Sequence, residues 1–270
     1  MAIICPIQFR ILNDEEFRKL DYQIMAHVFA SHNELGRLCD ERIYQKDIAS
    51  RLETAGFGLV QTEVPLTVRW RTFRKDYFLD LVVQDLMLYE LKTASTIVGE
   101  HKNQLLNYIL LLGLHSGKLL NLRPPAVESW FASSSLTLDE RRQIEVDTTQ
   151  WGKLSPACDL LRSGIVELAG ELGAFLDVTL YEDLLMQMLG GEKQVIQPVE
   201  MHRDGISLGH QKCHLISPDI GFRITAHTED QDQAESQMRR WLSHTKLRAL
   251  QWINFNRTRV EFTTLIRAMR

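Results

Sequence analysis

The sequence predicts an α/β fold built on mixed β-sheets. Three observations predict it: segments with helical and strand-like periods alternate along the chain, each such segment has one apolar face, and a set of residues recurs in the same order 133 to 137 positions later. The expected order in the first half is helix, helix, three strands, helix, strand. We therefore expect one αβ unit that is tandemly duplicated.

Three helices are expected in the first half. The first covers Leu20–Leu35, where apolar residues recur at helical spacing before Gly36. The second covers about Leu38–Leu52, and the third covers His101–Leu114.

Four strands are expected between and after these helices. Val60–Trp70 alternates between apolar and polar residues, and its proline, Pro65, indicates a position at the sheet edge. Two short runs rich in β-forming residues surround Gln84-Asp85 and predict a hairpin. The four predicted strands are Val60–Trp70, Phe78–Val83, Met87–Lys92 and Lys118–Leu122.

The second half repeats the first with similar residues in the same order. Glu34-Leu35-Gly36 recurs as Glu171-Leu172-Gly173, and Leu119-Leu120-Asn121-Leu122 as Trp252-Ile253-Asn254-Phe255. Single residues follow the same order: Tyr44 with Tyr181, Gln104 with Gln237, and Tyr108 with Trp241. We expect a first domain at 1–135, a polar linker at 136–154 and a second copy at 155–270.

Composition restricts the function classes. The 270 residues are 44% hydrophobic and 24% charged, which is typical of a globular protein and excludes a disordered chain. No apolar run approaches the ~20 residues of a membrane span, and the first residues lack the basic region of a secretory signal. The four cysteines lie far apart, which argues against a disulfide framework and favours the cytoplasm.

Asp80, Glu90 and Lys92 form the strongest candidate site. Glu90 and Lys92 are two apart in a strand and therefore share a face. A three-residue hairpin loop would place Asp80 opposite Glu90, so that two carboxylates and an ammonium converge. A two-residue loop would place Asp80 opposite Tyr89 and separate the carboxylates.

Two chemical interpretations of this cluster are open. Two carboxylates with few soft ligands suit Mg²⁺ or Mn²⁺, with Lys92 beside the ion to orient a water molecule or a phosphate. The alternative is a structural salt bridge at the end of a sheet. Two further pairs share helix faces and favour the first interpretation: Glu41 with Tyr44, and Gln104 with Tyr108.

Together these residues resemble the GxxExxY proteins, a branch of the PD-(D/E)XK nuclease superfamily. The resemblance covers roughly Leu20 to Phe131 and includes Gly36, Glu41 with Tyr44, the strand from Thr62 to Leu66, Leu79-Asp80-Leu81, Tyr89-Glu90-Leu91-Lys92, and Gln104 with Tyr108. One departure is visible: Leu38 stands where the family has a glycine three residues before the motif glutamate.

The resemblance implies a restriction-endonuclease-like αβββαβ core and metal-dependent hydrolysis of a DNA phosphodiester. Asp80 and Glu90 would hold Mg²⁺ or Mn²⁺, with the Leu91 carbonyl as a further ligand, and Glu41 would reach the ion directly or through water. Lys92 would orient the nucleophilic water. Gln104 and Tyr108 would line the site.

The second copy is expected to lack this chemistry. Aligning the two hairpins at their turns places Val178 where the first copy has Glu41, His214 at Asp80, Ile224 at Glu90 and Ala226 at Lys92. We therefore expect a catalytic copy followed by a degenerate one, the two forming a pseudo-dimer.

Net charge is −4, from 31 basic and 35 acidic residues, so phosphate contacts must be local. From Met238 to the end of the chain, 8 residues are basic and 1 is acidic. The expected nucleic-acid contacts are Arg69, Arg71, Arg74 and Lys75 before Asp80, and Arg239 and Arg240 in the second copy.

The sequence thus favours a Mg²⁺-dependent nuclease acting on DNA, in which the second copy is structural or holds the substrate. A homo-oligomer is an alternative to the intramolecular pseudo-dimer. One rival function is a non-catalytic nucleic-acid-binding or protein-assembly module that keeps the motif residues. Another is hydrolysis of a small phosphorylated molecule, which would require a closed pocket rather than an open groove.

Overall fold

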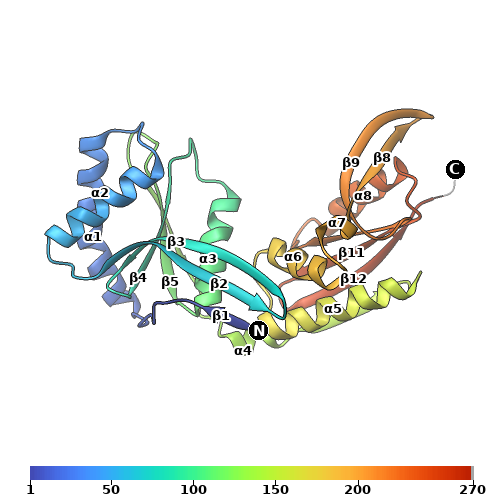
Figure 1. Cartoon of the computed structure of the whole chain (residues 1–270), viewed down its shortest axis with the longest axis horizontal. Coiled ribbons are helices and arrows are strands. Elements are labelled where there is room, and N and C mark those ends of the chain that lie inside the picture. The colour runs from blue at the N-terminus through green and yellow to red at the C-terminus, as the bar shows by residue number, and fades with distance from the viewer. Residues whose placement is uncertain (269–270) are drawn as a thin grey trace. The chain divides into compact units, whose positions relative to one another are not determined.

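The computed structural model describes residues 1–268. The chain divides into two compact units, Met1–Thr137 and Leu138–Arg270. Each unit contains a six-stranded mixed sheet with helices on both faces (Figure 1). Because each sheet takes its strands from one unit only, the two units are described separately.

The sheet of the first unit has the strand order β1-β2-β3-β4-β5-β6. Neighbouring strands are antiparallel except β4 and β5, which are parallel and joined by the crossover helix α3. The elements are β1 (Ala2–Ile4), α1 (Asp14–Leu35), α2 (Glu41–Thr54), β2 (Val60–Trp70), β3 (Phe73–Val83), β4 (Met87–Lys92), α3 (Gly99–Leu112), β5 (Ser116–Asn121) and β6 (Glu128–Ser133).

Helices α1 and α2 pack on one face of this sheet. Their apolar residues, including Ile24 and Ile48, share a buried core with Leu81, Tyr89 and Leu91 of β3 and β4. Helix α3 lies on the opposite face, where Leu105 approaches β5. Since side chains alternate along a strand, Asp80 and Glu90 point away from the core of α1 and α2 and toward the face of α3.

The edge of this sheet differs from the sequence prediction. The short strand β1 was not predicted, and it pairs with residues 67–69 of β2, so β2 is not the edge strand. Pro65 lies beyond the end of that pairing, which leaves its missing N–H without consequence for the ladder. The strand β6 was also not predicted.

The second unit has the strand order β8-β9-β10-β11-β12-β7. Strands β10 and β11 are parallel and joined by α8, as β4 and β5 are joined by α3. The elements are α4 (Leu138–Arg142), β7 (Glu145–Gln150), α5 (Pro156–Leu172), α6 (Val178–Met188), α7 (Glu192–Val195), β8 (Ile196–Arg203), β9 (Ile206–Ser217), β10 (Ile220–Thr225), α8 (Gln231–Ser243), β11 (Ala249–Asn256) and β12 (Arg259–Ile266).

The predicted linker at 136–154 is wrong. This segment contains α4 and β7, and β7 pairs in parallel with β12 at the edge of the second sheet. Buried Arg141 of α4 donates hydrogen bonds to the carbonyl oxygens of Leu172 and Ala174, at 2.9 and 3.1 Å. The polar residues of segment 136–154 therefore bind carbonyl groups at the end of α5 and add a strand to the sheet. Composition alone does not reveal either role.

Two side-chain contacts recur in both units. The Tyr44 hydroxyl donates to the Gly36 carbonyl oxygen at 2.5 Å, and the Tyr181 hydroxyl donates to that of Gly173. The contacts join the start of α2 to the glycine that ends α1, and the start of α6 to the glycine that ends α5. Both tyrosines are almost completely buried.

A buried asparagine forms the other repeated contact. The Asn121 amide donates to the carbonyl oxygen of Ala94 at 2.9 Å and accepts from the N–H of Ala94 at 3.1 Å. Asn254 makes the same pair of bonds to His227, at 2.9 and 2.8 Å. In both units the asparagine holds the segment that follows the central parallel strand.

None of the helices within residues 1–268 is long and apolar enough to cross a membrane.

Candidate active site

The candidate site lies on the hairpin of β3 and β4. Val83 pairs with Met87, which leaves a loop of three residues, and Leu81 pairs with Tyr89. Asp80 therefore lies opposite Glu90. This is the first of the two registers considered from the sequence, the one in which the two carboxylates share a face.

Lys92 lies among three carboxylates. Its Nζ is 2.6 Å from Glu90 Oε1, 3.9 Å from Asp80 Oδ2 and 4.0 Å from Glu41 Oε2. Glu41 reaches the cluster from α2, where it is the first helical residue. Burial lowers the pKa of the Lys92 ammonium, but Glu90, Asp80 and Glu41 outweigh this effect and raise it. Lys92 is therefore charged and offsets part of the negative charge.

Glu90 is the most buried member of the cluster. Its side chain is completely buried, and Oε2 has no hydrogen-bond partner within residues 1–268. Burial and the neighbouring Asp80 carboxylate raise the pKa of Glu90 to about 8, although Lys92 opposes this shift. An unpaired carboxylate oxygen in a dry site is costly unless another group binds it.

Burial also raises the pKa of the other two carboxylates of the cluster, Asp80 and Glu41. Burial raises the pKa of Asp80, while the backbone N–H of Leu91, which donates to Asp80 Oδ2 at 2.7 Å, lowers it. Burial raises the pKa of Glu41 to about 6, with Lys92 opposing the shift and Asp80 adding to it. Both carboxylates thus resist ionisation when no further cation is present.

Glu63 is a fourth acidic residue at the site, and it is not among the site residues predicted from the sequence. In β2, Thr62 pairs with Leu81 and Val64 pairs with Leu79, so Glu63 lies across from Asp80. Its charge raises the pKa of both Asp80 and Glu41. The antiparallel pairing of the predicted strands would have revealed it, but only once their register is known.

Gln104 and Tyr108 project from α3 toward the same face of the sheet. Gln104 Nε2 donates to the Tyr108 hydroxyl at 2.9 Å. Burial and the charge of Glu90 raise the pKa of Tyr108. All six predicted catalytic residues, Glu41, Asp80, Glu90, Lys92, Gln104 and Tyr108, therefore come from the two helices and the hairpin that surround one end of the sheet.

The family comparison agrees with this geometry. Residues 18–130 match the family model of the PD-(D/E)XK nuclease superfamily. This range includes α2, the hairpin and α3, which are the elements that supply the cluster. No curated protein and no solved structure matches the chain. The match shows that this part of the first unit is similar to the PD-(D/E)XK nucleases.

The cluster fits a hard divalent cation. No three His, Cys, Asp or Glu side chains among residues 1–268 are already arranged as a metal cage. Mg²⁺ does not need such a cage, because one or two carboxylates with water and substrate phosphates complete its coordination. The unpartnered oxygen of Glu90, with Asp80 opposite it, supplies such carboxylate oxygens.

The predicted basic contacts of the first unit are not beside this cluster. Arg71 lies in the turn between β2 and β3, and Arg69 pairs with Arg74 near that turn. Asp80 is six positions after Arg74, which is about 20 Å along a strand. Arg74 contacts Asp76 at 3.0 Å, and Lys75 lies over the ring of Tyr77. The expectation of a phosphate clamp next to the metal ligands is therefore wrong.

The predicted alignment of the second copy with the first is wrong by one position. The Asn121 and Asn254 contacts and the parallel ladders match Glu90 with Arg223, because Glu90 pairs with Leu119 and Arg223 pairs with Trp252. Ile216 is an extra residue in the β9–β10 ladder, where Ser217 pairs with Ile220 but Leu215 pairs with Gly221. This bulge shifts any alignment that starts from the turn.

The corrected equivalents are Cys213 for Asp80, Arg223 for Glu90 and Thr225 for Lys92, in place of His214, Ile224 and Ala226. Val178 keeps the place of Glu41, since it begins α6 as Glu41 begins α2. The second unit therefore lacks the acidic cluster, but it carries an arginine at the central position.

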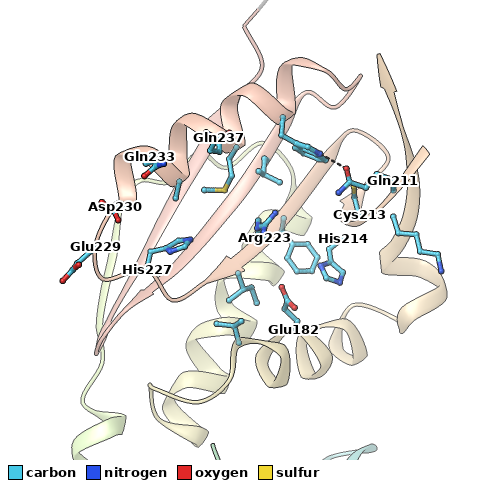
Figure 2. A pocket seen from close by; sticks show the side chains of 18 residues that line it. Glu182, Gln211, Cys213, His214, Arg223, His227, Glu229, Asp230, Gln233 and Gln237 are labelled. Atoms are coloured by element: carbon cyan, nitrogen blue, oxygen red, sulfur yellow. Dashed lines mark hydrogen bonds between the residues drawn. The ribbon is translucent and has the colours of Figure 1, made fainter. Parts of the chain in front are cut away.

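Arg239 and Arg240 lie on α8 and are exposed. Arg239 forms an ion pair with Glu235 of the same helix at 2.7 Å. Other residues of α8, namely Gln233, Gln237 and Trp241, line the cavity of this unit (Figure 2).

Proposed function

We propose that the first unit is a metal-dependent nuclease that hydrolyses phosphodiester bonds of DNA. The main support is the convergence of Asp80, Glu90 and Lys92 on one face of the β3–β4 hairpin. The unpartnered, fully buried oxygen of Glu90 is costly as a purely structural feature and is suited to a cation. The superfamily match over the same elements supports nuclease chemistry.

Asp80 and Glu90 would hold Mg²⁺ or Mn²⁺, and Glu41 would bind the ion directly or through water. A divalent ion held there would polarise the phosphate and lower the pKa of a bound water. The backbone N–H of Leu91 keeps Asp80 oriented toward the site, because it donates to Oδ2 at 2.7 Å.

The remaining residues would act on the water and the phosphate. Lys92 Nζ, now 2.6 Å from Glu90, would orient the attacking water or donate to a phosphate oxygen as negative charge develops on it. Gln104 and Tyr108 would hold a phosphate oxygen or the water through their linked amide and hydroxyl. The attacking oxygen forms a bond to phosphorus, and one P–O ester bond breaks.

The β2–β3 hairpin would contact the substrate away from the cleaved bond. Arg69, Arg71, Arg74 and Lys75 lie at the turn of this hairpin. At about 20 Å from Asp80, they would bind phosphates that are not being cleaved. The second unit, in which β8 to β12 follow the same order as β2 to β6, would be a degenerate copy that holds the substrate.

A cleavage assay with a conservative variant tests the proposal. Wild-type protein should cleave plasmid or single-stranded DNA in Mg²⁺ or Mn²⁺ and not in EDTA. Glu90→Gln should reduce the rate about 100-fold or more, because it removes charge from the ion-binding group while keeping its shape. Gel electrophoresis of the products measures the rate.

The matched control is Glu53→Gln. Glu53 is an exposed glutamate of α2 outside the cluster, so the same change of charge there should leave the rate within twofold. Circular dichroism checks that both variants are folded. Equal rates for Glu90→Gln and the wild type, or no cleavage by the folded wild type in either metal, would contradict the proposal and favour a non-catalytic module.

A further inference from the structure

The second unit has a cavity at the position that corresponds to the candidate active site. It lies between α6, α8, β9 and β10 and has a volume of about 920 Å³. Figure 2 shows Gln233 and Gln237 on the helix along one side, Arg223 on the strand at the centre and Glu182 on the opposite helix.

The position of the cavity follows from the repeated contacts. Counting from the matched pair Asn121 and Asn254, Gln237 corresponds to Gln104 and Trp241 to Tyr108, and both line the cavity. Val178, which corresponds to Glu41, lines it as well. The cavity is thus lined by the counterparts of Gln104, Tyr108 and Glu41 of the first site.

The charge at its centre is inverted. Arg223 stands where Glu90 stands in the first unit, and it is exposed, whereas Glu90 is buried. Cys213 and Thr225 replace Asp80 and Lys92. The carboxylate pair of Asp80 and Glu90 is therefore absent from these positions, where a guanidinium that can bind phosphate directly stands instead. The wider lining of the cavity also includes the carboxylates Glu182, Glu229 and Asp230 and the basic side chain of Lys212.

Glu182 lines the same cavity and can be compared with Asp80 of the first unit. In the first unit the N–H of Leu91 donates to Asp80. In the second unit the corresponding amide is that of Ile224, and the carboxylate near it is Glu182, which comes from α6. Burial raises the pKa of Glu182, whereas Arg223 and this amide lower it. Glu182 is therefore the carboxylate closest in role to Asp80.

We propose that this cavity binds a phosphate of a single-stranded nucleic acid through Arg223, without a metal ion and without cleaving it. The proposal rests on the proposed nuclease function and names the part of the molecule that retains the substrate. The guanidinium would supply the positive charge that a divalent ion supplies in the first unit.

The cavity lining favours a single strand over a duplex. Trp241 is half-buried, and its indole N–H donates to Gln211 at 3.1 Å. Gln233 and Gln237 add further amide groups to the same wall. Aromatic rings and amides contact bases that have left a stack, whereas bases in a duplex are stacked and paired.

Binding without metal tests the inference. The full-length protein is titrated against a fluorescein-labelled 12-nucleotide single strand in EDTA, and fluorescence anisotropy measures the affinity. Arg223→Ala should weaken binding about tenfold, because it removes a charge-assisted contact. Loss of one phosphate contact should also reduce the slope of log affinity against log salt by about 0.7. Unlabelled duplex should compete less well than unlabelled single strand.

Arg162→Ala is the matched control. Arg162 is a partly exposed arginine of α5 outside the cavity, and its removal should leave the affinity and the salt slope unchanged. Arg223→Gln, which keeps more of the side-chain volume, should weaken binding as the alanine variant does. Thermal melting verifies the fold of each variant.

Three outcomes would overturn the inference: no binding by the wild type in EDTA, equal affinities of wild type and Arg223→Ala, or equal competition by duplex and single strand. The assay does not use cleavage. A protein that binds through Arg223 but never cleaves would refute the proposed nuclease function and leave this site in place. A protein that cleaves with Mg²⁺ but binds no strand in EDTA would refute this site alone.

Discussion

Glu90 and Arg223 occupy the same place in two similar sheets and carry opposite charges. Glu90 is buried next to Asp80, so its charge is costly unless a cation is bound, while Arg223 is exposed and needs no such partner. Since the second unit has Arg223 and still arranges β8 to β12 in the order of β2 to β6, the acidic cluster is not needed to form these five strands. The side chains proposed to perform the chemistry are therefore different from those that stabilise the fold.

Tyr44 is a residue whose role the structure assigns to folding. Its hydroxyl donates to Gly36 at 2.5 Å and does not contact the carboxylate cluster. Tyr44→Phe should lower the free energy of unfolding by about 1 kcal/mol, because the carbonyl loses its partner. The cleavage rate should stay within twofold. Urea unfolding and the plasmid assay measure the two effects.

Tyr108→Phe provides the comparison, since the Tyr108 hydroxyl accepts from Gln104 and experiences the charge of Glu90. We expect it to reduce the cleavage rate about tenfold or more. A tenfold loss in folded Tyr44→Phe would instead place Tyr44 in the chemistry.

Helix ends and bulges determine how the elements of each unit fit together. Gly36 ends α1 and Gly173 ends α5, with φ of +71° and +76°, and both accept the hydrogen bond of a tyrosine. In the second unit α4 packs against this end, and Arg141 satisfies its carbonyl groups. A polar segment that was predicted to be a linker is in this way part of the fold.

The two glycines make a matched pair for substitution. Gly36→Ala should cost about 1–3 kcal/mol from backbone strain alone, because nothing lies within 4 Å of the new Cβ. Gly173→Ala should cost about 1–3 kcal/mol more, because its Cβ would lie 2.6 Å from Cβ of Arg141. Urea unfolding of both variants measures the difference, and equal losses would show that α4 moves aside at little cost.

The whole molecule consists of two units that each have a complete sheet and core. Each unit has over 130 residues, which is enough to bury a core of its own. The acidic cluster lies within the first unit and the cavity of Arg223 within the second. Cleavage and metal-free binding are therefore proposed as separable properties.

Expression of the two units as separate chains tests this separation. The fragments 1–137 and 138–270 should each unfold cooperatively, as followed by circular dichroism. The first should cleave DNA with a kcat within a few-fold of the full chain and a higher KM, because it lacks the second binding site. The second should bind single strands in EDTA and cleave none. Cleavage that requires both fragments together would contradict two independent sites.

Much of the first unit could be predicted from the sequence, because its signals are local. The strands Val60–Trp70 and Met87–Lys92 have the predicted bounds, since alternation and turn residues define them. The six predicted catalytic residues lie around one end of the sheet because their spacing within each element decides which face they share. The short strand β1 has too few residues to show a period.

Only the tertiary structure decided the pairing between strands, and with it the remaining features of both sites. Glu63 joins the cluster because β2 pairs with β3 in one register, and Arg223 is the counterpart of Glu90 because Ile216 is bulged. A one-residue shift moves every side chain to the other face of a strand, and the sequence of one strand does not encode the register of its neighbour. The sequence by itself thus determined the elements and the acidic cluster, whereas strand pairing decided which residues complete the first site and what replaced it in the second.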